Sequence, residues 1–347
     1  MKGAIMKNFG ALGAKLAALA LFACLAPAAL AQSPVADFYR GKTVHLLIGV
    51  NVGASYDLEG RLIARHLGRF IPGNPSIVPQ NMLGGGGIVM ANYLQNIAAK
   101  DGTYLGMMPN TLPMAQAVGL EGVRYDATKF AWLGSVMPRA HSALVAWAES
   151  GVKSIEDLRR QEVSNGASPK GSFTYTMPAM INELLGTKMK LVAGYQGINT
   201  IFLALERGEV ATVAVTWNDF EQDKADWVRD RRINVLVQSS PKSPTLPGTP
   251  AVEELLKDPG DRALVALLLS GNAMGRPLAA TPDTPRDRAD TLCAAFEAMR
   301  ADPAFREDAR RSRVHVGDLT GAPIAAAVAA VMATPRAEIE RGRKILE

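Results

Sequence analysis

The sequence predicts an α/β protein built from two lobes, and three observations support that fold class. From Lys42 onward, short runs rich in β-forming residues alternate with longer helical patterns, as in a largely parallel sheet. Several of the junctions between a strand and a helix are rich in glycine. The chain of 347 residues also exceeds the roughly 100 to 200 residues of one domain. We therefore expect two domains.

The N-terminus has the pattern of a secretory signal peptide. Three lysines and no acid accompany the apolar run at residues 16–26, and small residues follow it. The run is shorter than the roughly 20 residues that a membrane-spanning helix needs. We expect cleavage after Ala31 and export of a mature chain that begins at Gln32 to the periplasm. Cys24 offers a lipoprotein alternative, which its bulky neighbour Phe22 disfavours.

Charge and cysteine content narrow the class of protein. Removing residues 1–31 takes away three lysines and no acid, so the formal net charge falls from +5 to +2. No basic run is interleaved with aromatic residues, so we expect no nucleic-acid partner. Only Cys293 remains after cleavage, which leaves no intramolecular disulfide. Its apolar neighbours predict that Cys293 is a buried filler.

The first lobe contains two successive units of strand, glycine-rich loop and helix. We expect strands at 43–50, 76–80 and 103–108, a helix from about Tyr56, and a second helix that the glycines at 84–87 open and that runs through Ile97. The second lobe begins with a strand at 142–147. Ser154 and Asp157 follow it with the spacing of a capping box. Further strands are expected at 162–167, 190–195, 211–217 and 233–239.

The C-terminal part of the chain reads as loop and then helix. Residues 241–250 have the composition of a linker, and the pattern beyond Thr281 is nearly all helical. Such a tail has no strands of its own, so we expect it to pack on the first lobe. The predicted division is 1–31 signal peptide, 32–138 and 246–347 first lobe, and 139–245 second lobe, with crossings near residues 139 and 245.

Two junctions in the first lobe have the composition of anion sites. Unpaired N–H groups and the helix dipole attract anions where a glycine-rich turn leads into a helix. We expect ligand contacts, with Ser55 as the N-cap of the first helix and four glycines that let backbone approach a ligand in the second junction. A plain turn and cap is the alternative for either junction alone. The candidate residues are Gly53, Ala54, Ser55, Tyr56, Asp57, Gly84, Gly85, Gly86 and Gly87.

The second lobe has two comparable segments at the ends of predicted strands. Ligands of open α/β sheets bind at the carboxyl ends of strands, where all four segments are expected to lie. Lys170 could add a counter-charge, although most loop lysines are solvated. Trp217 could line the cleft, although most tryptophans serve packing. The candidate residues are Ser168, Gly171, Ser172, Thr174, Tyr195, Gln196, Gly197 and Trp217.

Signals for catalysis or metal binding are weak. The four histidines have no metal-ligand spacing to another histidine, cysteine or glutamate, and His45 reads as a core or edge residue of a strand. No nucleophile elbow occurs, and no lysine and hydroxyl residue follow the glycine run as in a phosphate-binding loop. We expect neither enzyme activity nor a cofactor or metal.

The ordered motifs of the chain resemble the substrate-binding receptors of tripartite tricarboxylate transporters, the TctC or Bug family. The matching segments are residues 41–49, 57–66, 78–87, 99–103, 153–158, 194–197, 205–210 and 246–250. The resemblance implies a two-lobed type II periplasmic-binding fold with a ligand cleft between the lobes. It also implies carboxylate ligands, contacts at the candidate loops, and one large and one small membrane permease subunit as partners.

The chain departs from the family pattern in two loops. Residues 52–55 read Val-Gly-Ala-Ser where adjacent glycines are usual, and the loop after Ser168 contains Pro169 and Lys170 with Phe173 and Tyr175 close behind. These departures leave the identity of the carboxylate open. A periplasmic sensor that presents its ligand to a signalling kinase would need the same cleft. An exported hydrolase would need a histidine partner for a nucleophile such as Ser172.

Overall fold

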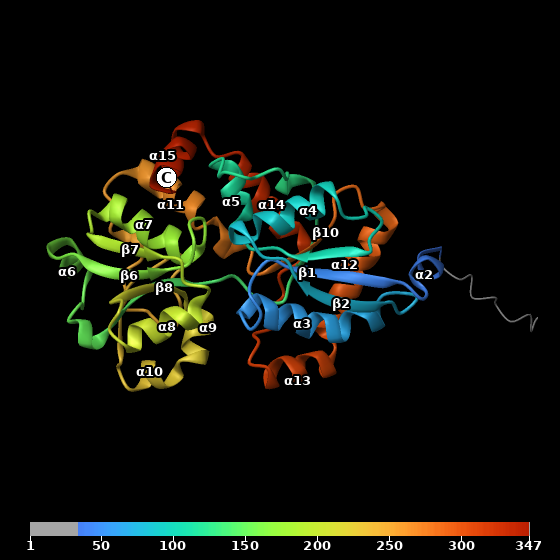
Figure 1. Ribbon diagram of the computed structural model, residues 1–347, viewed down its shortest axis with the longest axis horizontal. Coiled ribbons are helices and arrows are strands. Elements are labelled where there is room, and N and C mark those ends of the chain that lie inside the picture. The colour runs from blue at the N-terminus through green and yellow to red at the C-terminus, as the bar shows by residue number, and fades with distance from the viewer. Residues whose placement is uncertain (1–33, 347) are drawn as a thin grey trace, which may run out of the picture.

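The computed structural model describes residues 34–346 and shows two lobes, each built on one five-stranded sheet (Figure 1). The predicted signal peptide and its cleavage site lie outside the described residues. The α/β class and the two-lobed architecture predicted from the sequence are confirmed.

The first sheet has the strand order β2-β1-β3-β10-β4. Parallel pairing joins β1 to β2 and β3, with Thr43 opposite Ser76, whereas β10 runs antiparallel to β3 and β4. The sequence missed β4 and β10, and β10 enters the sheet from the far end of the chain. The strands are β1 (Thr43–Ile48), β2 (Ser76–Asn81), β3 (Tyr104–Met107), β4 (Ala131–Ser135) and β10 (Pro277–Ala280).

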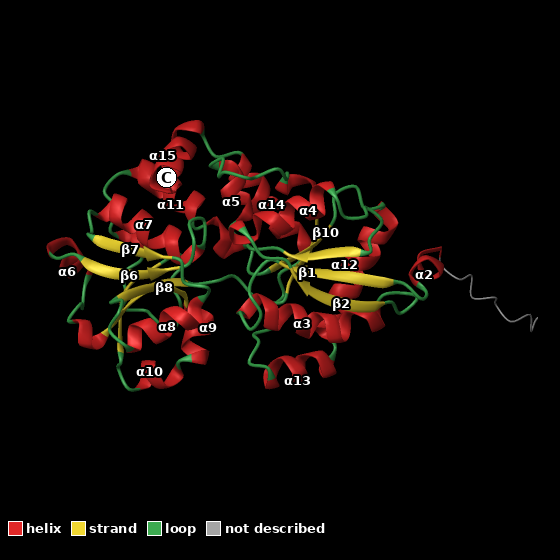
Figure 2. Ribbon diagram, in the orientation of Figure 1, coloured by secondary structure: helices red, strands yellow, loops and turns green. Residues whose placement is uncertain are grey.

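Helices cover both faces of the first sheet (Figure 2). One apolar core lies between one face of the sheet and a first set of four helices, and a separate core lies between the opposite face and a second set of three. The first set is α2 (Pro34–Tyr39), α3 (Ser55–Leu67), α12 (Arg286–Ala301) and α13 (Pro303–Arg311). The second set is α4 (Ile88–Asn96), α5 (Leu112–Ala117) and α14 (Gly321–Met332). Cys293 is partly buried beside the first core.

The second sheet repeats the arrangement with the order β7-β6-β8-β5-β9. Parallel pairing joins β6 to β7 and β8, and β5 runs antiparallel to β8 and β9. The sequence placed all five strands to within about two residues. The strands are β5 (Ser142–Trp147), β6 (Val163–Ala167), β7 (Met189–Ala193), β8 (Thr212–Thr216) and β9 (Ile233–Gln238).

Two layers of helices enclose the second sheet. One layer contains α6 (Ile155–Arg160), whose predicted Ser154–Asp157 capping box is confirmed, and α7 (Phe173–Leu185). The opposite layer contains α8 (Ile198–Glu206), α9 (Trp217–Asp223) and α10 (Ala225–Arg229), with Trp147, Phe202 and Trp227 packed among them. Single turns of 3-10 helix occur at Gly68–Phe70, Gly85–Gly87, Ala127–Lys129, Ala148–Ser150, Val252–Glu254 and Ser270–Ala273.

The C-terminal tail is divided between the lobes, whereas the sequence placed all of residues 246–347 in the first. Helices α12 to α14 pack on the first sheet. Helices α11 (Pro259–Leu268) and α15 (Arg336–Leu346) instead join the core of α7 in the second lobe (Figure 1). Arg343 on α15 also donates from Nε to the Val118 carbonyl at 2.8 Å. Apolar residues of the two helices thus find their partners far away in sequence, which residue patterns do not reveal.

The chain crosses between the lobes at 136–141, between β4 and β5, and within 239–276, between β9 and β10. Asn272 ties the two crossings together. Its carbonyl accepts from the Ala140 N–H at 2.9 Å, its Oδ1 accepts from Ser142 Oγ at 2.8 Å, and its Nδ2 donates to Ser239 Oγ at 3.0 Å. One residue therefore joins the two connections between the lobes.

Leu264→Ala on α11 is expected to lower the free energy of unfolding by about 2 to 5 kcal/mol, because it opens a cavity between α7, α11 and α15. Leu264 is fully buried. The control Leu203→Ala, at a side chain that is 50% exposed on α8, should change stability by no more than about 0.5 kcal/mol. Urea denaturation of both variants measures the difference, and equal effects would contradict the packing of the tail on the second lobe.

Candidate functional site

A cavity of about 500 Å³ lies between the lobes at the carboxyl ends of the parallel strands. It is lined at the carboxyl ends of β1, β2, β3, β6, β7 and β8 and by the segments that follow them, which is the position expected for ligand sites in open α/β sheets. Phe202 and Arg276 complete the wall. The strand ends, loops and helix starts at this edge contribute residues 49–51, 54–56, 83–86 and 109–111 from the first lobe, and 168–169, 172–174, 195–198, 214–216, 219–220 and 223 from the second.

Most residues singled out from the sequence meet at this cavity. Those that line it are Ala54, Ser55, Tyr56, Gly84, Gly85, Gly86, Ser168, Ser172, Thr174, Tyr195, Gln196 and Gly197. Those that lie outside its lining are Gly53, Asp57, Gly87, Gly171 and Trp217. Lys170 is exposed and does not line the cavity.

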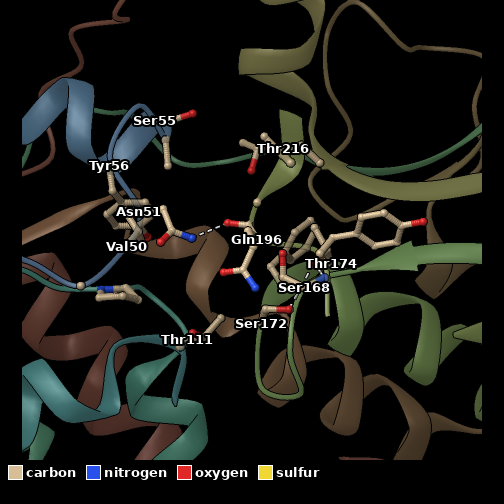
Figure 3. Close-up of a pocket in the computed structure, with 18 of the residues that line it drawn as sticks. Val50, Asn51, Ser55, Tyr56, Thr111, Ser168, Ser172, Thr174, Gln196 and Thr216 are labelled. Atoms are coloured by element: carbon tan, nitrogen blue, oxygen red, sulfur yellow. Dashed lines mark hydrogen bonds between the residues drawn. The ribbon is translucent and has the colours of Figure 1, made fainter. Parts of the chain in front are cut away.

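Asp57 supports the loop after β1 from behind the cavity wall. Its buried carboxylate accepts from the Gly53 N–H at 2.9 Å, from Arg61 Nε at 3.0 Å and from Asn81 Nδ2 at 2.9 Å. Burial opposes ionisation, but these hydrogen bonds outweigh it and lower the pKa of Asp57. The N-cap of α3 is Ala54 rather than Ser55 as predicted, so Ser55 is the first helical residue and faces the cavity (Figure 3).

The four-glycine loop after β2 has a backbone that side chains would disfavour. Gly84, Gly85, Gly86 and Gly87 have φ values of 131°, 55°, 65° and 99°, a region that residues with a Cβ seldom adopt. The first three line the cavity. A Cβ on Gly87 would lie 2.5 Å from Pro109 Cγ, so Gly87 serves the close packing of this loop on the loop after β3.

The loop after β6 is held by hydroxyl groups. Thr174 Oγ1 accepts from the Ser168 N–H at 2.9 Å and lies 3.2 Å from Ser172 Oγ (Figure 3). Gly171 lies behind, where a Cβ would approach Leu120 Cδ1 to 2.9 Å. The three hydroxyl residues thus line the cavity while they shape the turn into α7.

The loop after β7 contacts the opposite lobe. Asn51 Nδ2 donates to the Gln196 carbonyl across the cavity (Figure 3). Gly197 is the N-cap of α8, and Tyr195 and Gln196 line the wall just before it. The lobes therefore touch directly through these two loops.

Trp217 does not line the cavity. It begins α9 rather than ending a strand, its side chain is 2% exposed, and its indole N–H donates to Thr245 Oγ1 at 2.9 Å. It packs beside Phe220, which takes the place in the wall that the sequence suggested for Trp217.

Three long helices point their N-termini at the cavity without a capping side chain. The N-cap residues Ala54 of α3, Ser172 of α7 and Gly197 of α8 line the cavity, and none accepts a hydrogen bond from its helix through a side chain. The first N–H groups of a helix have no partner within the helix. These ends therefore offer donors and partial positive charge to the cavity.

A buried arginine that no residue pattern predicted links the two lobes at the same cavity. Arg276, just before β10, is ion-paired with Glu59 of α3 through one terminal nitrogen and with Asp219 of α9 through the other. Its guanidinium also lies 5.3 Å from the Tyr56 ring centre. Burial disfavours its charge, but the two carboxylates outweigh burial and raise the pKa of Arg276.

Burial also raises the pKa of Glu59, to about 7; Arg276 opposes this shift and Asp219 adds to it. Glu59 Oε2 is buried and has no hydrogen-bond partner among the described residues, so the raised pKa comes from loss of solvation and not from a hydrogen bond to the neutral acid.

Several other residues that line the cavity were also not predicted from the sequence. Asn51, Asn110 and Thr111 follow first-lobe strands, and Thr216 ends β8. The rule about the carboxyl ends of strands could have found them, since β1, β3 and β8 were predicted. Arg276 precedes a strand that was missed, and no residue pattern marks it.

Within residues 34–346, no group of three or more histidine, cysteine, aspartate or glutamate residues could hold a metal ion. Over the same range, no single helix is long and apolar enough to cross a membrane; α14 and α15 qualify only as a pair that bends by 91°.

No protein-family model matches the chain. A Cupriavidus necator protein, the UPF0065 protein in the gbd 5′ region, is 25% identical over 245 residues, which are 67% of this chain and 70% of that protein.

The fold is similar to those of solved solute-binding proteins. BugD has a TM-score of 0.65 and 18% identity, covering 89% of this chain and 99% of BugD. MatC from Rhodopseudomonas palustris, solved with malate, has a TM-score of 0.62 and 21% identity, covering 88% and 99%. A TctC protein from Polaromonas has a TM-score of 0.60 and 15% identity, covering 88% and 98%. The predicted periplasmic-binding fold and the resemblance to Bug and TctC proteins are confirmed at the level of the fold.

Glu59 is expected to contribute to the free energy of unfolding at low pH and to lose this contribution as the pH rises. Glu59→Gln should remove that pH-dependent contribution. The pKa of Glu59 is raised from 4.5 to about 7 on folding, so the folded protein keeps a proton that the unfolded chain has released. This contribution is complete below pH 4.5 and is lost as the pH rises through about 7.

Calorimetric melting from about pH 5 to pH 8 should therefore show the wild-type Tm declining relative to that of the variant. Glu121→Gln, at an exposed residue, is the control and should keep the wild-type dependence. A constant difference between wild type and Glu59→Gln would show that Glu59 does not titrate in this range.

Proposed function

We propose that this protein is an exported receptor of the Bug and TctC family that captures a small carboxylate for a tripartite tricarboxylate-type transporter. One observation carries the proposal: the uncapped N-termini of α3, α7 and α8 converge on one cavity between the lobes. An anion placed there accepts hydrogen bonds from backbone N–H groups and is stabilised by the helix dipoles.

The rest of the cavity suits a small organic acid. Its volume of about 500 Å³ lies within the range of roughly 300 to 1,000 Å³ for small-molecule sites. Hydroxyl groups of Ser55, Ser168, Ser172 and Thr174 line it beside the helix ends. In this proposal, backbone and hydroxyl groups hold the carboxylate, and no cofactor takes part.

Binding and closure are coupled in this proposal. The lobes would open about the crossings at 136–141 and 239–276, as in hinge closure around a ligand. The Asn51–Gln196 hydrogen bond and the Arg276–Asp219 ion pair would then form on closure. The closed form would dock on one large and one small membrane subunit.

The solved relatives support this reading. BugD is described as a periplasmic binding protein, and MatC was solved with malate. The apolar run at residues 16–26 supports export to the periplasm, with cleavage after Ala31.

A carboxylic acid should bind far more tightly than its amide of the same shape. The amide loses charge-assisted hydrogen bonds to the helix ends, each worth roughly 1.5 to 3 kcal/mol. Calorimetric titration of hexanoate and phenylacetate against hexanamide and phenylacetamide measures the difference. Equal affinity of acid and amide would refute the anion site.

Gly86→Ala should weaken binding of such an acid by about tenfold or more, a change of about 1.4 kcal/mol. The new Cβ meets no protein atom within 4 Å and Gly86 lines the cavity, so the methyl group would take up space beside the ligand. The control Gly151→Ala has a similar φ of +79° and equally open surroundings away from the cavity. Both variants should lose similar stability, and similar affinities would exclude this loop as a contact.

A further inference from the structure

The charged residues of the cavity are unevenly placed. Among the described lining residues, only Arg276, Asp219 and Asp223 carry charge. All three lie on the side of the cavity formed by β8 and β10. In the first sheet this side contains β10, on which the chain returns from the second lobe. In the second sheet β8 lies beside β5, on which the chain enters from the first lobe. The loops after β2 and β7 lie at the opposite edges of the two sheets. The cavity thus has a charged end near the crossings and an uncharged end away from them.

The arginine at the charged end is already neutralised. Arg276 is 7% exposed and pairs with Glu59, which is 3% exposed, and with Asp219, which is 23% exposed. A ligand carboxylate could reach the guanidinium only by displacing Asp219 or by adding a third carboxylate to one buried cation. Either change leaves a carboxylate without its partner in a weakly solvated place, which is unfavourable.

Asp223 adds a second carboxylate of α9 to this end of the cavity. Its pKa is raised, first by burial and then by the negative charge of Asp219; Arg276, Arg313 and Lys224 oppose the shift without cancelling it. A second ligand carboxylate at this end would therefore meet two acids, Asp219 and Asp223, beside a cation that is already paired.

Apolar side chains form much of the remaining wall. Phe202 of α8 and Phe220 of α9 are 6% and 2% exposed and line the cavity. Val215 and Ile198 lie beside them in the same apolar cluster. Phe173, at the start of α7, lines the cavity from the other side of the sheet. A ligand whose carboxylate meets the N-termini of α3, α7 and α8 would lay its body along these side chains. Burial of an apolar body there is favourable by about 25 cal/mol per Å².

We propose that the receptor selects a monocarboxylate with an apolar body and rejects a dicarboxylate of the same length. A second carboxylate would reach the end of the cavity that is lined by Asp219, Asp223 and the neutralised Arg276. The inference rests on the proposed carboxylate-binding function and refines its substrate class. It separates this chain from MatC, which was solved with the dicarboxylate malate.

Matched ligand pairs test the proposal on the mature protein at neutral pH. Calorimetric titration compares hexanoate with adipate, and 4-methylphenylacetate with 4-(carboxymethyl)benzoate. In each pair the monocarboxylate should bind about tenfold or more tightly, which corresponds to about 1.4 kcal/mol. A dicarboxylate that binds as tightly as its partner, or more tightly, would overturn the inference.

A variant that removes one carboxylate tests whether the acidic end of the cavity causes the preference for monocarboxylates. Asp223→Asn should narrow the ratio of hexanoate to adipate affinity severalfold. The control Asp226→Asn removes a nearby exposed carboxylate that does not line the cavity, and it should leave the ratio at the wild-type value. Equal ratios in wild type and both variants would overturn the role of the acidic end.

The two proposals fail in distinguishable ways. If hexanoate and hexanamide bind equally, the anion site at the helix N-termini is wrong and the proposed function fails. If the acids bind better than the amides but adipate equals hexanoate, the receptor function stands and only the monocarboxylate selectivity is wrong.

Discussion

The two ion pairs of Arg276 are the interaction on which the arrangement of the cavity depends. Arg276 leads into β10, the strand on which the chain returns from the second lobe, and Ser135 Oγ accepts its backbone N–H at 2.9 Å. Glu59 ties its side chain to α3, and Asp219 ties it to α9. A helix of each lobe and the returning strand thus meet at one guanidinium. Because an unpaired buried charge costs several kcal/mol, the network favours the relative position of α3 and α9, and with it the direction of the α3 N-terminus toward the cavity.

Side chains behind the cavity wall hold the backbone that forms it, and Asp57 is the buried one among them. Asp57, Arg61 and Asn81 form one hydrogen-bonded group that joins the loops after β1 and β2, and Asn81 Nδ2 also donates to the Val50 carbonyl at 2.9 Å. The residue types that suggested a ligand site therefore divide into two roles. Asp57 holds the loop, whereas Ala54, Ser55 and Gly84 to Gly86 present it to the cavity. Asp57 was a candidate because of its place in the first turn of a helix, where the helix dipole favours an acid whether or not it touches a ligand.

The sequence could predict those parts of the structure that neighbouring residues in the chain determine. The β-rich runs and the glycine junctions are local, and they gave eight of the ten strands and most of the loops that meet at the cavity. The short strand β10, Pro277–Ala280, has a proline and two alanines, and it is a strand because β3 and β4 flank it. The choice of α15 for the second lobe depends on its contact with α7 and α11. Arg276 is recognisable only through Glu59 and Asp219, which lie far from it in sequence.

The helix ends at the cavity explain why ligand binding and closure should be one event. Away from the cavity, Ser154, Asp258 and Asp302 cap α6, α11 and α13, each cap being worth about 1 kcal/mol. An uncapped end is not by itself a site, since Thr320 leaves α14 uncapped as well. The cavity differs because it gathers uncapped ends of longer helices from both lobes, α3 from the first and α7 and α8 from the second. Ser172 is of a capping type, yet its hydroxyl lies 3.2 Å from Thr174 Oγ1 and caps no N–H of α7. A carboxylate that accepts from both sides at once satisfies donors of both lobes, so its binding energy is complete only when the lobes are closed.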